Sequence, residues 1–182
     1  MKLAERVLGF WFGLGEDGYR EIWFEKDPDF DRKIEDKFTA DLKRATAGGH
    51  DALAETPDGA LALIILLDQF SRNLWRGRAE AFAADPKARE IAKLAIANGF
   101  DLKMPLYRRS FFYMPFEHSE ILADQERGVD LFTALGDENM LTYMIRHRDI
   151  VARFGRFPHR NEVLGRTNTP EEIEFLNDFK PF

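Results

Sequence analysis

The chain has no cysteine among its 182 residues, which excludes disulfides, thiolate metal ligands and cysteine nucleophiles. It also lacks a long hydrophobic run. The most apolar stretch, ALALIILL at residues 60–67, is far shorter than the roughly 18 residues that a membrane helix requires. Glu5 and Arg6 interrupt the N-terminus, where a signal peptide would have an unbroken apolar segment. The sequence therefore predicts a cytoplasmic protein without membrane contact.

Several chemical motifs are missing as well. No glycine-rich nucleotide loop and no Gly-x-Ser-x-Gly elbow of a serine hydrolase occurs. The helical metal-binding patterns Glu-x-x-His, His-x-x-x-His and His-Glu-x-x-His are absent too. The net charge of -6 argues against nucleic-acid binding, which needs a basic surface. We therefore expect no metal, no cofactor and no nucleic-acid partner.

What the chain does contain is helical periodicity and aromatic bulk. Its 17 phenylalanines predict a core with large rings. Apolar residues recur about every 3.6 positions, and no stretch shows the alternation of a strand. The length is typical of one domain. The sequence predicts a single all-α domain over residues 1–182, a bundle of antiparallel helices with no β-sheet.

Three helix starts share one pattern. Asp27, Asp85 and Thr169 each precede a proline, so a capping side chain stands directly before a residue suited to the first helical position. Glu172 follows Thr169 at the spacing of a capping box. Other helices are expected over residues 57–75, 115–135 and 138–154. The first of these is apolar on nearly every side, so we expect it at the centre of the fold.

The stretch LLDQFSRNLWRG, residues 66–77, carries the first polar group with chemical interest. Asp68 and Arg72 are four residues apart and share one face of the central helix, so they can pair. A carboxylate at that depth would be costly without a partner. The pair is either a structural ion pair or, together with Asn73, part of a ligand site.

The stretch YMPFEHSEILADQ, residues 113–125, carries the second group. Pro115 is expected to open a helix, with Glu117 and Glu120 in its first turn. The periodicity turns His118 inward, where it is either a general acid–base or a hydrogen-bonded core histidine. His147 lies in a stripe of aromatic and methionine side chains and is expected to belong to the core.

The densest polar stretch is ARFGRFPHRNEVLGR, residues 152–166. Arg153, Arg156 and Arg160 bring guanidinium groups that can hold a carboxylate or phosphate through paired hydrogen bonds. His159 and Asn161 accompany them at the start of a short helical turn, where backbone N–H groups favour an anion. That anion is either a ligand or a carboxylate of the protein itself, with three candidates: Asp68, Glu117 and Glu120.

Three long segments, LALIILLDQFSRNLWRG, SFFYMPFEHSE and RFGRFPHRNEVLGR, occur in this order. They resemble the motifs of the bacterial family Domain of Unknown Function 924. The N-terminal FWF and IWFEKDPDFD and the C-terminal TPEEIEFL are similar to further motifs of that family, so the resemblance spans nearly the whole chain. It implies an all-α, tetratricopeptide-like helical architecture, and it implies no reaction.

The polar residues of these three segments are the candidate site. We hypothesise that ten of them meet in one pocket: Asp68, Arg72, Asn73, Glu117, His118, Glu120, Arg153, His159, Arg160 and Asn161. The favoured function is a binding protein for a small anionic ligand or a peptide. One alternative is an enzyme acting on an anionic small molecule, with His118 or His159 as acid–base and Glu117 as a further catalytic candidate. The other is a structural helical scaffold for protein–protein interaction. A homo-oligomer is compatible with each.

Overall fold

The computed structural model describes residues 1–13 and 18–180, and its regular structure there is entirely helical, without a β-strand. This confirms the all-α prediction. The α-helices, in chain order, are α1 Leu3–Phe12, α2 Pro28–Thr46, α3 Pro57–Ile64, α4 Ser71–Leu74, α5 Asp85–Ala97, α6 Leu106–Glu117, α7 Leu122–Leu135, α8 Glu138–Phe154 and α9 Pro170–Asp178.

The helices pack into two compact units, and each is described by itself. The N-terminal unit comprises residues 1–76 and 80–115, and the C-terminal unit comprises residues 77–79 and 116–182. The single domain expected from the chain length stays a prediction.

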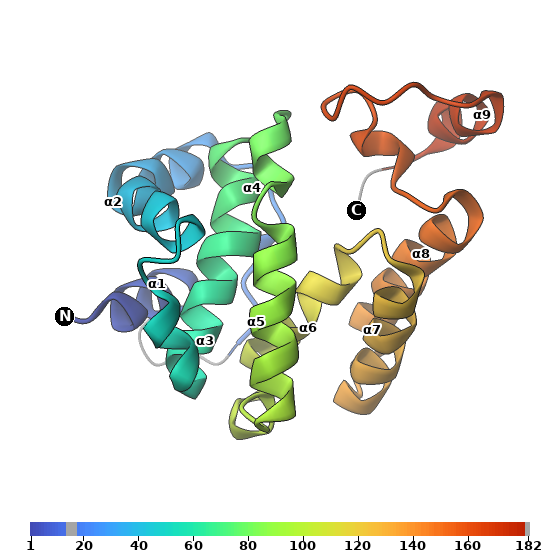
Figure 1. Ribbon diagram of the computed structural model, residues 1–182. Coiled ribbons are helices and arrows are strands. Elements are labelled where there is room, and N and C mark those ends of the chain that lie inside the picture. The colour runs from blue at the N-terminus through green and yellow to red at the C-terminus, as the bar shows by residue number, and fades with distance from the viewer. Residues whose placement is uncertain (14–17, 181–182) are drawn as a thin grey trace. The chain divides into compact units, whose positions relative to one another are not determined.

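The centre of the N-terminal unit is the helical run formed by α3, a π-helical segment at Ile65–Phe70, and α4. Thr56 caps its start by accepting a hydrogen bond from the Gly59 N–H at 3.2 Å. Every residue from Gly59 to Ser71 is buried, because α1, α2 and α5 pack around the run (Figure 1). The prediction of a central helix over residues 57–75 is therefore confirmed, with a π-helical stretch that the sequence did not indicate.

Large rings fill the core of this unit, as the phenylalanine content predicted. Trp11 is fully buried and contacts Phe70 and Phe111 edge-on, with centroids 5.5 Å and 5.7 Å away. Phe111 also meets Trp23 at 5.1 Å. Edge-to-face pairs of this kind add about 0.5–1.5 kcal/mol each beyond the area they bury. The aromatic core thus joins α1, α6 and the central helix.

Two of the three predicted helix starts are confirmed. Asp27 caps α2 by accepting hydrogen bonds from the Asp29 and Phe30 N–H groups, which lower the pKa of the Asp27 carboxyl. Thr169 and Glu172 form the expected capping box at the start of α9. The third prediction is wrong in detail, because Asp85 is the first residue inside α5 rather than its cap. Its side chain is held by an arginine of the central helix instead.

The prediction that Pro115 opens a helix is wrong. Pro115 lies inside α6, which continues to Glu117, and the next helix begins only at Leu122. The Gln125 amide donates hydrogen bonds to the carbonyl oxygens of Phe116, Glu117 and Ser119. It therefore caps the end of α6, and burial of the helix outweighs the backbone bond that proline cannot donate.

The break at residues 118–121 changes which side chains are buried. In the single helix expected over residues 115–135, Ile121 and Leu122 would share the inner face of His118, but they are 49% and 42% exposed. Gln125 and Phe132, further along the same face, are buried as that helix would require. His118 lies in the break and is half-buried, so it is not part of a helical core stripe.

In the C-terminal unit, α7 and α8 form an antiparallel pair joined by a short turn (Figure 1). The turn begins at Gly136, whose φ of 84° favours glycine. Gly128 of α7 lets α8 approach closely, because a Cβ atom there would stand 2.7 Å from the Met144 sulfur. Ile150 and Val151, near the end of α8, pack with Phe157 in a small core.

Candidate functional site

Asp68 and Arg72 form the ion pair that their spacing predicts. Asp68 is fully buried, and its Oδ1 lies 3.2 Å from Arg72 Nη1, while its Oδ2 accepts from Gln69 Nε2 at 2.6 Å. The same guanidinium makes two 2.9 Å hydrogen bonds to Asp85 at the start of α5. Arg72 therefore joins the central helix to α5 through two carboxylates, and the sequence did not indicate the second.

Asn73, the next candidate, has different partners. Its Nδ2 donates to Asp31 Oδ1 of α2 at 2.7 Å. Arg76 binds the same carboxylate, with Nε 2.7 Å from Oδ2 and Nη2 3.1 Å from Oδ1. Asn73 and Arg72 are neighbours in sequence but are fixed to two different helices.

The other seven candidates belong to the C-terminal unit, where Phe157 is a centre of polar contacts. Phe157 is fully buried and extended before Pro158, as expected for a residue preceding proline. Its N–H donates to Glu120 Oε1 at 2.8 Å, and its carbonyl accepts from Arg166 Nη2 at 3.1 Å. Arg166 and Glu120 close the ring through two hydrogen bonds of 2.6 and 2.9 Å. Burial alone would raise the pKa of Glu120, but the hydrogen bonds from Arg166 and the Phe157 backbone lower it.

A second closed pair lies beside this ring. Arg156 Nε and Nη2 donate to the two oxygens of Glu172 at 2.6 and 2.8 Å. Glu172 is buried and also accepts from the Thr169 N–H at 2.8 Å and from Asn161 Nδ2 at 3.3 Å. The Arg156 hydrogen bond, opposed by burial, brings the pKa of Glu172 down to about 2, and the pair raises the pKa of Arg156. We call the pairs Arg156–Glu172 and Arg166–Glu120 the polar clasp.

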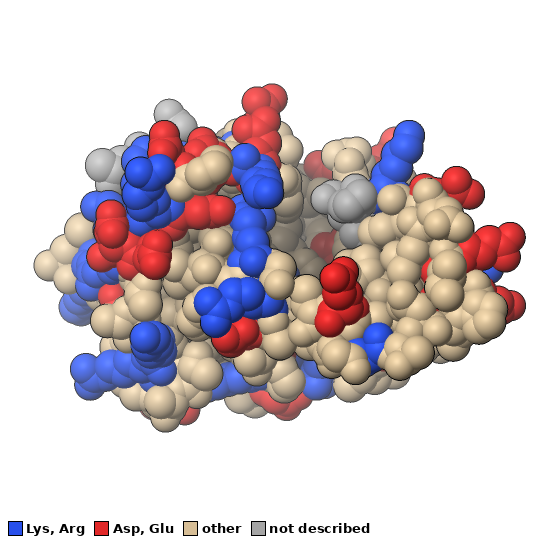
Figure 2. Space-filling view, turned by 90° about the horizontal axis from the view of Figure 1, so that it is seen from above, with Lys and Arg blue, Asp and Glu red and all other residues tan. Residues whose placement is uncertain are grey.

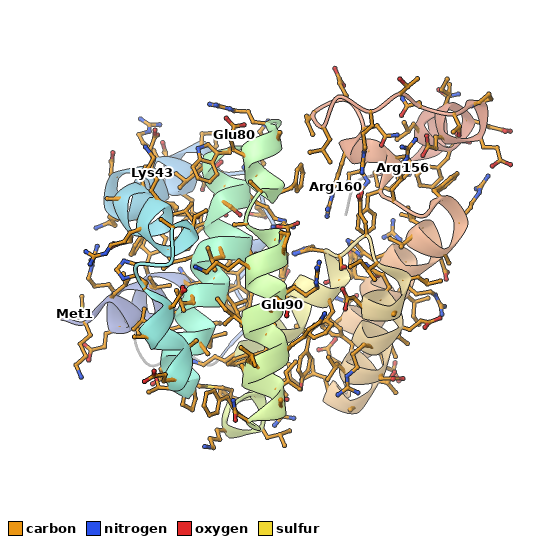
Figure 3. All side chains as sticks on the ribbon, viewed as in Figure 1. Met1, Lys43, Glu80, Glu90, Arg156 and Arg160 are labelled. Carbon is orange, nitrogen blue, oxygen red and sulfur yellow. The ribbon has the colours of Figure 1, made fainter. Side chains whose placement is uncertain are left out.

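The sequence named neither Glu172 nor Arg166 as a site residue. Glu172 was expected only to cap α9, and Arg166 was only the last residue of the polar stretch. Both arginines of the clasp lie in the segment 152–166, and Figure 3 labels Arg156 there together with Arg160. The carboxylates that meet them come from distant positions, which no local spacing could indicate.

Glu117 pairs with a histidine that was expected to be only a core residue. His147 is buried, as predicted, but its Nδ1 lies 3.1 Å from Glu117 Oε1 and 2.9 Å from the Tyr143 carbonyl oxygen. Both neighbours are acceptors, so Nδ1 carries the hydrogen. In the neutral ring Nε2 is then the basic atom, as in a general base oriented by a carboxylate.

His118 and Arg160 lie near the rings of His147 and Phe157. The His118 ring is 6.3 Å from that of His147, which itself stands edge-on to Phe157 at 5.6 Å. Arg160 Nη1 donates to the His118 carbonyl at 3.1 Å, and its guanidinium carbon lies 4.4 Å from the Phe157 ring centroid. Cation–π contact at this distance favours the charged guanidinium over the ring face.

His159 extends the ring contacts towards α9. Its ring stacks on Phe179 with centroids 5.0 Å apart and planes 7° apart, and it lies 5.5 Å from Phe157. Burial of the ring, followed by the nearby Arg160 and His147, lowers the pKa of His159 to about 4. His159 is therefore neutral at pH 7.

The candidates thus fall into two groups, three in the N-terminal unit and seven in the C-terminal unit. That all ten meet in one pocket stays a hypothesis. The anion expected at residues 152–166 is supplied in part by the protein, since Glu120 and Glu172 occupy Arg166 and Arg156. Within the described residues, no group of three or more His, Asp or Glu side chains is arranged to hold a metal ion.

Basic and acidic side chains are mixed over the N-terminal unit on the face shown in Figure 2. None of the described helices combines the length and apolar character needed to cross a membrane.

Fold and polar clasp together define an all-α protein whose C-terminal unit is held by internal arginine–carboxylate pairs. Residues 7–179 match the family model described as bacterial protein of unknown function (DUF924). Because the match covers nearly the whole chain, the chain belongs to this family, as its motifs suggested.

A solved structure with the same fold is a protein of unknown function, ATU0120, from Agrobacterium tumefaciens. It is 44% identical to this chain, covers 97% of it and 98% of its own length, and has a TM-score of 0.90. A search of curated proteins found no match.

Proposed function

We propose that the protein is a binding protein that recognises an acidic peptide on its C-terminal unit. The surface that carries this proposal is an aromatic row of Phe154, Phe175, Phe179 and His159. Successive centroids lie 5.0, 5.1 and 5.0 Å apart. The three phenylalanines are half-buried, and His159 is partly exposed although one face of its ring is covered by Phe179, so the row keeps solvent-accessible surface.

Arg153 supplies the charge preference. Its guanidinium carbon lies 4.6 Å from the Phe154 centroid, and its side chain is exposed. Among the described residues it forms no ion pair, whereas Arg156 and Arg166 are neutralised by the polar clasp. An arginine held over a ring at one end of an aromatic row favours a carboxylate close to an apolar side chain.

The length of the row favours a peptide over a small anion. Three steps of about 5 Å correspond to roughly five residues of extended chain at about 3.3 Å each. The tetratricopeptide-like architecture implied by the family resemblance fits this proposal, because helical-repeat proteins bind partners along extended surfaces. A cytoplasmic location, expected from the sequence, belongs to the same proposal.

The test measures fluorescence anisotropy with two labelled hexapeptides, alternating Glu–Phe and alternating Lys–Phe. The acidic probe is expected to bind, and Arg153→Ala is expected to weaken it about tenfold, as for a lost charge-assisted hydrogen bond. Arg148→Ala removes the same charge from α8 at a residue paired with Asp149 and is expected to leave binding unchanged. Equal binding of both probes, or no binding of either, would contradict the proposal.

An enzyme acting on an anionic small molecule is the second candidate, and the Glu117–His147 pair favours it. In this version His147 takes the acid–base role that the sequence gave to His118 or His159. The test is a screen of phosphate and carboxylate esters with wild type and His147→Asn. Turnover that disappears in the variant would support catalysis, and its absence in wild type would argue against this candidate.

A further inference from the structure

A pocket in the N-terminal unit plays no part in the proposed peptide binding. It has a volume of about 450 Å³ and lies between the first turns of α2 and the end of α4. Pro28 and Leu74 give it apolar walls, while Lys26, Glu35 and Asn73 bring polar groups. Its volume falls within the range of roughly 300–1,000 Å³ that small-molecule sites occupy.

Asn73 is a preorganised acceptor in this pocket. The side chain is 8% exposed, and its Nδ2 is committed to Asp31, which Arg76 holds with two hydrogen bonds. This network fixes the plane of the amide. The Asn73 Oδ1 accepts no hydrogen bond from the part of the chain that the structure describes, so it is available to a donor on a ligand.

The charges that line the pocket leave one cation and one anion unpaired. Arg32 is engaged by Asp29 at 2.7 Å, and Asp31 is engaged by Arg76. Lys26 and Glu35, both exposed, form no ion pair with any described residue. A ligand that neutralises both needs an anionic and a cationic group on one small body.

We propose that this pocket binds a small zwitterion of the amino-acid type. The ligand carboxylate pairs with the Lys26 ammonium, and the ligand ammonium donates to Glu35 and to Asn73 Oδ1. An apolar side chain rests on Pro28 and Leu74. Each hydrogen bond with a charged partner accounts for about a tenfold contribution to affinity. This site is separate from the aromatic row and does not depend on the proposed peptide binding.

The test titrates each of the twenty standard L-amino acids into ¹⁵N-labelled protein and follows the Asn73 side-chain NH₂ signals by NMR. At least one amino acid with an apolar side chain is expected to shift them in a saturable manner. Leucine is then compared with 4-methylpentanoate, which lacks the ammonium group, and with 3-methylbutylamine, which lacks the carboxylate. If leucine binds, both analogues are expected to bind at least tenfold more weakly.

Two pocket variants and two control variants complete the test. Lys26→Met and Glu35→Gln should each weaken binding of the amino acid about tenfold, while Lys33→Met and Asp36→Asn, two exposed residues of α2, should leave it unchanged. No saturable shift with any of the twenty amino acids overturns the proposal, and so does unchanged binding in both pocket variants. The anisotropy of the acidic hexapeptide is measured in parallel, so that failure at this pocket is distinguished from failure at the aromatic row.

Discussion

Arg156 and Glu172 lie 16 positions apart and meet through two hydrogen bonds, Nε to Oε1 at 2.6 Å and Nη2 to Oε2 at 2.8 Å. Glu172 also caps α9 through the Thr169 N–H. The Glu172 carboxylate therefore binds Arg156 in the segment after α8 and also caps the N-terminus of α9. The concentration of arginine that suggested an anion site is, at this position, the means by which α9 is attached.

Glu172→Gln keeps the shape of the side chain but removes its charge. We expect the melting temperature to fall by roughly 2–6 °C for a chain of this length, because the amide cannot replace both charge-assisted bonds. The matched control is Glu171→Gln, an exposed neighbour in the same turn. Equal melting temperatures of the two variants in calorimetry would show that the Arg156–Glu172 pair does not stabilise the fold.

The Glu172 carboxylate should also make the free energy of unfolding depend on pH. The pKa of Glu172 is about 2 in the folded chain against an ordinary value of 4.5. Its contribution is therefore complete above pH 4.5 and is lost as the pH falls towards 2. The difference in denaturant midpoint between wild type and Glu172→Gln should be largest above pH 5 and shrink below pH 4.5. A constant difference across this window would contradict the assignment.

His159 should produce a second, separate dependence on pH. Its folded pKa of about 4 lies below the ordinary 6.5, so the unfolded chain binds the proton more readily. Stability from this group is complete above pH 6.5 and declines as the pH falls to 4. His159→Phe retains a ring to stack on Phe179 and should remove the decline. Titration of the His159 ring protons by NMR gives the folded pKa directly, and a value near 6.5 would refute the prediction.

Arg72→Met should be far more damaging than Arg76→Met. Removing Arg72 leaves the fully buried Asp68 and the nearby Asp85 without their shared cation, which costs about 3 kcal/mol or more. Arg76 pairs with Asp31 in a more exposed setting, so its removal should cost less than about 1 kcal/mol. Urea unfolding of both variants measures the difference. Adding Asp68→Asn to Arg72→Met should recover part of the loss, which a double-mutant cycle quantifies.

The features that the sequence predicted correctly are those set by neighbouring residues. The caps at Asp27 and Thr169 and the pair Asp68–Arg72 depend on spacings of one to four positions, where helix geometry decides the contact. The central helix followed from a run of apolar residues that only a core can accommodate. Family motifs identified the candidate residues because they mark where polar side chains are concentrated.

The predictions fail where tertiary packing, rather than neighbouring residues, determines a helix boundary or a side chain's partner. The sequence predicts a helix start at Pro115, but burial of α6 and the Gln125 cap let the helix pass through the proline. The sequence predicts that Asp85 caps a helix, but Arg72 of another helix binds its carboxylate. The partners of Arg156 and Arg166 lie 16 and 46 positions away, and a single sequence carries no signal for such pairings.

The π-helical stretch at Ile65–Phe70 sets the angular register of everything that follows it in the central helix. A π turn accommodates one residue more than an α turn, and each residue of an α-helix advances by about 100°. If the same residues were wound as a plain α-helix, with none deleted, the end of the run would be rotated by about 100°. Arg72 would then no longer face Asp85, nor Asn73 face Asp31. The extra residue of the π turn thus sets the direction of Arg72 and Asn73, so that Arg72 faces α5 and Asn73 faces α2.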